Sequence, residues 1–480
     1  MAPESKILVD ANGAPIDPTG GFEAEYGFKG RSDVRGSKEA QIVFPATLLQ
    51  AANENYITSD AFYKDGSRRY IDVGDHPEYC TAEDIVFLNA AYRVLWGHNA
   101  MANQYAAGAK ALEEQEKLAG RDVQIEAELY ANTTDTYDNS WARHMNILAP
   151  RALMPEDYIP ALVAHRASRI VWSGAGHVIK RGRDGFQYVL SEKAEFIELD
   201  YGSETTRQRP LVNLRDIPLA DSELYRRIHD VSGEGVFSPR VMALQLASEA
   251  MILRACGLGV RFDDLKPFSG PLAMRTISHD PSLKAEVQVG RGSKYTGIQL
   301  QREIARRAIT ALERSDLMTD QDKIYKMIWQ AFLDDLEQGR FTAEDGKTQK
   351  FDWVSKRRRI TTALKSTTRK HSDYITAATM SREYHQTLPK KGTGMRLVQA
   401  GGFVDSPSSE VLENGPELPP TRGGLRGRTI DRLEKKNVNY AADWTHLEIY
   451  GEGTPPTIIL RNPFATENSE VEAALESVAA

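Results

Sequence analysis

Acidic side chains at alternate positions of two short segments most constrain how this chain can fold. The first segment reads Gly-Phe-Glu-Ala-Glu-Tyr-Gly over residues 21–27, which places Glu23 and Glu25 two positions apart. In a β-strand, side chains two apart point to the same face, roughly 6–7 Å from each other. The second segment, Tyr70-Ile-Asp72, follows the same rule. We therefore predict two strands whose polar side chains share one face of a sheet.

The segment His76-Pro-Glu78-Tyr follows the second strand and adds a further carboxylate. Several oxygen ligands that converge on one sheet surface suit Mg²⁺, a hard cation that usually also carries nucleotide phosphates. A Glu-x-Glu pair alone is more often a solvated strand face, but the neighbouring Asp72 and Glu78 favour a metal site. For His76 a hydrogen bond to its own loop is the alternative to a direct role. The sequence thus predicts a Mg²⁺ site on this face.

Composition excludes several classes of protein. A net charge of −7 and a pI near 5.9 argue against nucleic acid as a general partner, because phosphate binding needs a basic surface. No apolar run approaches the roughly 18 residues of a membrane span, and the amino terminus lacks the apolar core of a signal peptide. Two cysteines, Cys80 and Cys256, are too few for a disulfide framework or a thiolate zinc site. We expect a cytoplasmic monomer.

Periodicity, capping residues and turn residues predict the main elements. Helices are expected at 83–118, at 238–256, after a capping box formed by Thr319 and Asp322, and at 470–478 with Ser469 as the N-cap. Strands and hairpins are expected at 123–129, 177–190, 196–199, 211–214, 447–450 and 457–460. Residues 405–420 are rich in Pro, Ser, Gly and Glu, which is typical of a loop near a boundary.

These elements indicate an α+β protein with one large and one small domain. A chain of 480 residues is long enough for two or three domains. Residues 1–20 are predicted to be a flexible lead-in, residues 21–395 a large catalytic domain, and residues 396–480 a small C-terminal domain.

The order and spacing of several motifs, over more than 400 residues, resemble the Pup ligase and depupylase family. This family is a branch of the glutamine-synthetase and glutamate–cysteine-ligase superfamily. The matching stretches are Gly21–Gly27, Tyr70–Thr81, Asn213–Asp216, Tyr225–His229, Ser278–Leu283, Asp352–Arg357, Thr421–Gly427 and Asp443–Leu447. No single motif is specific, but their combined order is.

The resemblance implies a curved antiparallel sheet that forms a glutamine-synthetase-like cradle for ATP (or ADP plus phosphate) and Mg²⁺. Helices would flank this sheet, and the C-terminal domain would pack near the nucleotide. Members act on the isopeptide bond between the C-terminal glutamate of Pup, a small acidic disordered tag, and a substrate lysine. In the ligases, ATP phosphorylates the side-chain carboxylate of that glutamate and the lysine amine displaces phosphate. In the depupylases, the nucleotide acts more as a cofactor while the same bond is hydrolysed.

The resemblance also assigns roles to individual residues. The expected metal ligands are Glu23, Glu25 and Glu78. The expected catalytic residues are Asp72, His144, His229 and Arg215. The expected nucleotide contacts are Arg207, Arg209, Arg422 and Arg426. Asp72 would accept a proton from lysine or from a hydrolytic nucleophile, which requires that geometry keep it off the metal.

Some of these assignments have structural alternatives. His144 and His229 could each make a structural contact instead of a catalytic one. The arginines would contact phosphates or a developing oxyanion, because guanidinium offers fixed forked donors. Arg226 and Arg227 could be an ordinary exposed pair on a helix, and only one of the two is expected to matter.

A basic run, Lys356-Arg357-Arg358-Arg359, stands out in an acidic protein. We interpret it as a local dock for an acidic polypeptide rather than for nucleic acid, and Pup is such a ligand. A merely solvated helix face is the alternative. The expected partners are therefore Pup and pupylated proteins, with neither nucleic acid nor a membrane.

The direction of the reaction is less well determined by the motifs. The segment between the glutamate strand and the aspartate strand is short, as in the ligases, whereas deamidating depupylases carry a long insertion there. Residues shared by both subgroups are replaced, however, at Met145, Ile217, Leu219 and Gly233–Val236. Because isopeptide hydrolysis asks for less positional control than phosphoryl transfer, we predict a divergent depupylase without the long loop. The alternatives are an ATP-dependent Pup–protein ligase, a non-catalytic Pup-binding protein, and an amide ligase for a small amino acid.

Overall fold

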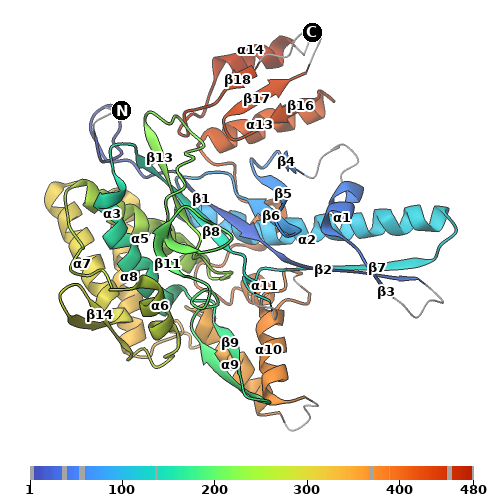
Figure 1. The fold of residues 1–480 in the computed structure, drawn as a ribbon. Coiled ribbons are helices and arrows are strands. Elements are labelled where there is room, and N and C mark those ends of the chain that lie inside the picture. Colours follow the sequence, from blue (N-terminus) through green and yellow to red (C-terminus); the bar gives the residue numbers. More distant parts are fainter. Residues whose placement is uncertain are drawn as a thin grey trace.

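An eight-stranded curved sheet forms the centre of the protein (Figure 1). The computed structural model describes residues 5–34, 40–52, 60–135, 139–366, 371–388, 390–450 and 457–477. The strand order is β11 (Leu199–Gly202), β12 (Pro210–Asn213), β13 (Tyr225–Asp230), β8 (Arg143–Pro150), β1 (Gly20–Glu25), β6 (His76–Cys80), β5 (Arg68–Asp72) and β4 (Asp60–Phe62). Neighbouring strands run antiparallel, except that β11 and β12 are parallel.

Alternation along β1 explains how this strand divides its side chains between two environments. Phe22 and Ala24 are buried in the main apolar core. Glu23 and Glu25 point to the opposite face, as their spacing predicts, and both line a cavity there. β1 pairs with β6 on one side and with β8 on the other. The two predicted polar strands therefore belong to one sheet, as expected.

Helices cover the apolar side of this sheet. The long helix α2 (Phe87–Leu118) contacts β1 and α5 (Pro239–Gly257). The remaining helices of this layer are α1 (Pro45–Ala52), α3 (Pro155–Ser168), α4 (Ile170–Ser173), α6 (Gly270–Ser278), α7 (Gly297–Ser315) and α8 (Asp320–Glu337). The capping box of α8 is confirmed, because Thr319 accepts a hydrogen bond from the Asp322 N–H and Asp322 accepts one from the Thr319 N–H.

The helix predicted from residue 83 starts later, at Phe87. The backbone of Asp84 pairs instead with Gly20 at the start of β1. The Asp84 side chain accepts a hydrogen bond from the Val86 N–H at 2.9 Å and forms an ion pair with Arg93. These contacts tie residues 83–86 to the sheet and delay the helix.

A second, three-stranded sheet extends away from the centre as an arm, at the right of Figure 1. Its strands are β3 (Ala40–Ile42), β2 (Gly27–Val34) and β7 (Val123–Tyr130), and β7 contains the strand predicted at 123–129. Only Tyr26 separates β1 from β2. The arm is therefore a direct continuation of the strand that carries Glu23 and Glu25.

Two further hairpins and a helical layer lie below the sheet in Figure 1 and beside it. The hairpins are β9 (His177–Arg181) with β10 (Gly185–Val189), which confirms the one predicted at 177–190, and β14 (Glu286–Val289) with β15 (Ser293–Thr296). The helices are α9 (Asp352–Leu364), α10 (Asp373–Tyr384), α11 (Thr393–Gln399) and α12 (Ser409–Asn414). α9 contacts α10, and α10 contacts β9.

The C-terminal residues form a small core of their own, at the top of Figure 1. It is built from α13 (Arg422–Lys435), β16 (Tyr440–Ala442), β17 (His446–Ile449), β18 (Thr457–Ile459) and α14 (Ser469–Ser477). β17 and β18 confirm the predicted hairpin. Leu412 on α12 still belongs to the main core, whereas the small core starts at Leu425. The division after residue 395 stays a prediction.

Three other details differ from the sequence expectations. The strand expected at 196–199 begins only at Leu199, because residues 193–196 close a turn in which the Phe196 N–H donates to the Lys193 carbonyl. The cap of α14 is Asn468 rather than Ser469, since its side chain accepts from two backbone N–H groups. In the lead-in, Leu8 is buried beside Leu148. Within the described ranges, no helix is long and apolar enough to cross a membrane.

Candidate active site

Three glutamates from two neighbouring strands meet on the polar face of the sheet. Glu23 and Glu25 lie on β1 and Glu78 on β6, and Glu25 is directly opposite Glu78 in the strand register. All three line a cavity of about 1020 Å³, which we call the main cavity. Asp72, at the end of β5, lines the same cavity. The acids that the sequence singles out are therefore brought together.

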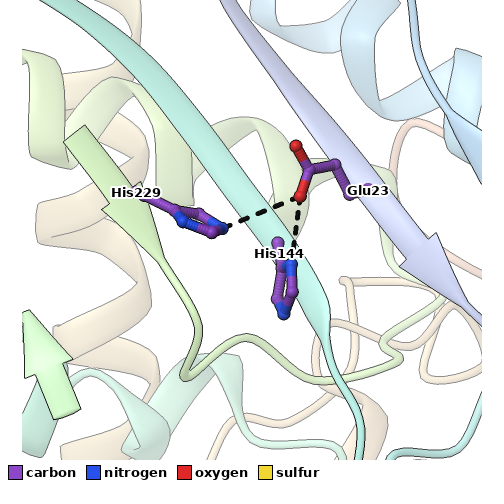
Figure 2. Close-up of side chains that lie close together, drawn as sticks. All are labelled: Glu23, His144 and His229. Carbon is purple, nitrogen blue, oxygen red and sulfur yellow. Dashed lines mark hydrogen bonds and ion pairs between the residues drawn. The ribbon is translucent and has the colours of Figure 1, made fainter. Parts of the chain in front are cut away.

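His144 lies between these glutamates and belongs to two groups of side chains that could bind a metal ion. Its Nδ1 donates to Glu23 Oε2 at 3.0 Å, and its Nε2 lies 3.6 Å from Glu25 Oε1. His229 approaches from β13, with Nε2 3.7 Å from Glu23 Oε2 (Figure 2). The ligand atoms of Glu23, His144 and His229 lie within 4.8 Å of one another, and so do those of Glu25, Glu78 and His144. Both sets have the size of a metal site.

The charges of this cluster do not cancel. Burial and the neighbouring Glu23 and Glu25 carboxylates raise the pKa of Glu78 well above its usual range. Burial would also raise the pKa of Glu23, but the hydrogen bond from His144 and the charge of Arg227 hold it far below its usual range. Although burial lowers the pKa of His144, the carboxylates of Glu25 and Glu23 raise it to about 9. Like charges held together in this way are the environment that a divalent cation stabilises.

His229 differs from His144 in its state of charge and in its contacts. Burial lowers the pKa of His229 to about 3, so that its ring is neutral. Among the described residues, neither ring nitrogen of His229 has a hydrogen-bond partner. A neutral imidazole with a free nitrogen near Glu23 fits a ligand or a substrate contact better than a structural role.

Asp72 lies beside the glutamate cluster but belongs to neither of its groups. It ends β5 at a tight hairpin and pairs in register with His76. The turn between them contains Gly74 and Asp75, both with positive φ. His76 Nδ1 donates to the Tyr26 carbonyl at 2.9 Å, and its ring lies on Trp141 with the centroids 4.6 Å apart. The hairpin thus fixes a carboxylate at the cavity wall, and this carboxylate belongs to neither of the two groups that could hold a metal.

The predicted arginines separate into two sets. Arg207, Arg209 and Arg215 line the main cavity. Arg422 and Arg426 lie on α13 and do not; both form ion pairs with Glu83.

Arg422 reaches a smaller cavity of about 70 Å³, which we call the small cavity. Glu23 lines both cavities, so that the two are neighbours. Arg426 lines neither, because it is fully buried between Phe62 and Trp444 and donates to the Gly66 carbonyl. Arg426 thus links the C-terminal core to the edge of the central sheet.

The sequence indicates that one of Arg226 and Arg227 matters but not which of them, and its motifs miss Lys193. Arg227 lines both cavities and lies 3.5 Å from Glu23 Oε1, whereas its neighbour Arg226 pairs with Asp216. The signal was present, because Arg227 is two positions before His229 on β13 and shares its face. Lys193 also lines the main cavity, and burial lowers its pKa to about 8. No motif points to it.

The basic run does not form a continuous surface. Lys356 is fully buried on α9 and donates to the Gly176 carbonyl at 2.6 Å. Its ammonium also lies 3.3 Å from Glu192. Arg357 and Arg358 are exposed. The expectation that Lys356 contacts a docked polypeptide is therefore wrong, because the helical period turns this residue into the core.

A sequence profile of the Pup-ligase protein family matches residues 21–448. The chain belongs to the Pup-ligase protein family. Its relatives include proteins named Pup–protein ligase from Acidimicrobium ferrooxidans and Sanguibacter keddieii, each 30% identical over 95% of this chain and 98% of the relative. The Pup–protein ligase of Kribbella flavida is 28% identical over 95% of this chain and 99% of its own length. The predicted family is confirmed, and the chain is an enzyme of this family.

Solved structures of Pup-ligase proteins share the fold. The complex between prokaryotic ubiquitin-like protein Pup and its ligase PafA superimposes with a TM-score of 0.82 at 23% identity, over 96% of this chain and 92% of that chain. The Pup ligase PafA in complex with ADP gives a TM-score of 0.74 at 24% identity, over 92% of this chain and 96% of that chain. The predicted curved antiparallel sheet, with flanking helices and a small C-terminal domain, is confirmed.

The prediction that this Pup-ligase protein is a depupylase is wrong. Relatives that match nearly its whole length carry the name of ligases. Two of the replaced positions also have little bearing on the chemistry. Met145 and Glu234 are buried and do not line the main cavity. These replacements alter the wall behind the site rather than the groups that face it.

Proposed function

We propose that this protein is an ATP-dependent ligase that joins the C-terminal glutamate of Pup to lysines of acceptor proteins. One observation carries the proposal: the glutamates, the aspartate, both histidines and three arginines expected of such a site line a single cavity. The names of the relatives support synthesis rather than hydrolysis as the direction of the reaction. The fold shared with a Pup-bound and an ADP-bound ligase supports the choice of substrates.

Glu23, Glu25 and Glu78 would hold Mg²⁺, with His144 between them. Three carboxylates from two strands form an oxygen-rich donor set, which suits this hard cation. Burial and the neighbouring Glu23 and Glu25 carboxylates raise the pKa of Glu78, which supports a cation site where these carboxylates meet. When bound, Mg²⁺ would neutralise charge on the phosphates during phosphoryl transfer.

Two neighbouring regions would bind different parts of the nucleotide. Arg207, Arg209 and Arg215 face the main cavity, where forked guanidinium donors bind phosphate oxygens. The small cavity is mainly apolar and is lined by Trp444 and Pro218, surfaces on which a purine can stack. We therefore place the base in the small cavity and the phosphates in the main one.

Asp72 would act as the proton acceptor. A lysine ammonium must lose a proton before its nitrogen can attack the activated glutamate carboxyl group. The Asp72 carboxylate takes this first proton, the amine nitrogen then forms the isopeptide bond as the bond from the carbonyl carbon to the phosphate oxygen breaks, and the second amine proton leaves with the phosphate. The hairpin places this carboxylate on the cavity wall without making it part of either ligand group.

A third cavity offers a route for the tag. It has a volume of about 730 Å³, lies between β2, β9 and α10, and shares Trp141 with the main cavity. Lys29, Lys180 and Arg382 contribute positive charge to its lining. An acidic polypeptide fits such a surface, and we propose that Pup reaches the site along it.

The test is a reconstitution with purified protein, Mg²⁺, ATP, an acceptor protein and Pup that ends in glutamate. We expect a conjugate on a denaturing gel and one ADP released for each bond formed. Glu25→Gln, assayed in parallel, should form no conjugate. ADP release without conjugation, or breakdown of a preformed conjugate in preference to its synthesis, would refute the proposal.

A further inference from the structure

Residues 140–142 form a short stretch of the cavity wall on which several site residues depend. The N–H of Ala142 donates to Glu25 Oε2 at 2.8 Å. The ring of Trp141 supports His76, whose strand partner is Asp72. This stretch therefore holds Glu25, a proposed metal ligand, and supports the hairpin of Asp72, the proposed proton acceptor.

The same stretch supports the phosphate side of the cavity. The guanidinium of Arg209 donates to the carbonyl of Ser140. Ser140 and Trp141 are themselves nearly buried, with 8% of each residue exposed. A shift of this backbone would therefore move Glu25, the Asp72 hairpin and Arg209 together.

Lys193 lies underneath and holds the stretch in place. Its ammonium donates to Ser140 Oγ at 3.0 Å and to the Trp141 carbonyl at 2.9 Å. Lys193 is fully buried at the cavity wall, and its ammonium is already engaged by Ser140 and Trp141. Its two hydrogen bonds are charge-assisted and shielded from water, which makes them strong.

We propose that Lys193 is a positioning residue, which fixes residues 140–142 so that Glu25, Asp72 and Arg209 meet around one reacting centre. This inference rests on the proposed ligase function. Misplacing catalytic groups by about 1 Å can cost about 10²-fold in rate. This role depends on the hydrogen-bond donors of the Lys193 ammonium and not on the volume of its side chain. An arginine at position 193 should therefore preserve the role, and a methionine should not.

The experiment compares Lys193→Met with Lys193→Arg in the ligation assay. For Lys193→Met we expect kcat to fall by about 10²-fold while the KM for ATP changes little. Lys193→Arg should recover most of kcat, because guanidinium can donate to the same two oxygens. Ser140→Ala removes one acceptor only and should cause a smaller loss of kcat. It provides a milder variant if Lys193→Met does not fold.

A control and an independent signal separate positioning from general damage. Arg254→Met also removes a buried cation, one that faces Asp322 far from the cavity, and should lower stability without lowering kcat of the folded protein. Trp141 emission is isolated as the difference between each protein and its Trp141→Phe counterpart, and it should shift in Lys193→Met but not in Arg254→Met.

Three results would overturn the inference: a normal kcat in folded Lys193→Met, equal loss in Lys193→Arg and Lys193→Met, or an unchanged Trp141 emission. If the wild-type protein forms no conjugate, the proposed function fails, and the Trp141 emission still decides whether Lys193 positions the stretch.

Discussion

Two clusters of charged side chains lie on opposite faces of β13 and have opposite characters. On the cavity side, His229 faces the glutamates of β1 and β6. On the core side, its neighbour Asp230 joins Glu249, Arg166 and Arg169 in a buried network. The network holds two anions and two cations, and each of its side chains is at most 2% exposed. The glutamate cluster has no such balance.

The pKa values of Asp230 in the buried network and of Glu78 in the glutamate cluster are shifted in opposite directions. Burial would raise the pKa of Asp230, but Arg166 and Arg169 hold it far below its usual range. In the glutamate cluster, burial and like charges raise the pKa of Glu78. A buried charge cluster that is balanced is costly to break, whereas charged groups that line a cavity with perturbed pKa values are typical of a ligand site.

The largest expected effect on activity is in the open cluster. Asp72→Asn should lower the rate of ligation by about 10²–10⁴-fold, because general base catalysis contributes on that order. The melting temperature should stay close to that of the wild type, since Asp72 forms no buried ion pair within the part of the chain that the structure describes. Conjugate formation and thermal unfolding of the same preparation measure both. A large drop in melting temperature would show that Asp72 is structural.

The largest expected effect on stability is in the closed network. Glu249→Gln removes one of the two anions and leaves the two cations, Arg166 and Arg169, to share Asp230. Breaking a buried pair in this way costs about 3–5 kcal/mol of unfolding free energy. Urea denaturation measures it, with the exposed Glu286→Gln as a control that should change little. Equal stability of the two variants would contradict the comparison.

Glu234 offers an intermediate case, a buried carboxylate held mainly by neutral donors. Burial raises its pKa from 4.5 to about 7, against the opposing hydrogen bonds from Ser191 and the Ala175 N–H. Because the folded-state pKa lies above the unfolded one, the folded protein binds more protons between pH 4.5 and 7. Its stability should therefore fall across this window as the pH rises, by about 3 kcal/mol for this group.

The measurement for Glu234 is the difference in unfolding free energy between the wild type and Glu234→Gln at several pH values. The difference should change between pH 4.5 and 7 and be constant above pH 8. A constant difference throughout would show that the carboxylate is charged in the folded protein across this range.

The smallest expected effect concerns the exposed part of the basic run. Reversing Arg357 and Arg358 to glutamate should raise the KM for Pup by about threefold at low salt, and the effect should shrink at high salt because exposed charges are screened. Reversal of the exposed Arg314 on α7 is the control. An effect that does not respond to salt would point to packing instead.

Local patterns were enough to predict the open cluster. Alternation in β1 and the spacing of Asp72 and Glu78 placed these acids on one face without knowledge of the tertiary structure. The same rule would have found Arg227 from His229. Lys193 could not be found, because its importance arises from residues 140–142, which are distant in sequence.

The errors have a common physical cause. Lys356 and Arg357 are neighbours in a basic run, and only the packing of α9 decides that one is buried and the other exposed. Likewise, the replacements that suggested a depupylase include Met145 and Glu234, whose burial behind the cavity wall was not visible in the sequence. Residue type was informative, but its orientation required the fold.

Because only Tyr26 separates β1 from β2, the arm and the glutamate strand are joined at a single residue. Tyr26 is fully buried; its hydroxyl group contacts His98 Nδ1 at 2.9 Å, and its N–H donates to the Pro77 carbonyl at 2.9 Å. These contacts hold Tyr26 in place between the two strands. A displacement of the arm would therefore reach Glu25 through this one buried residue.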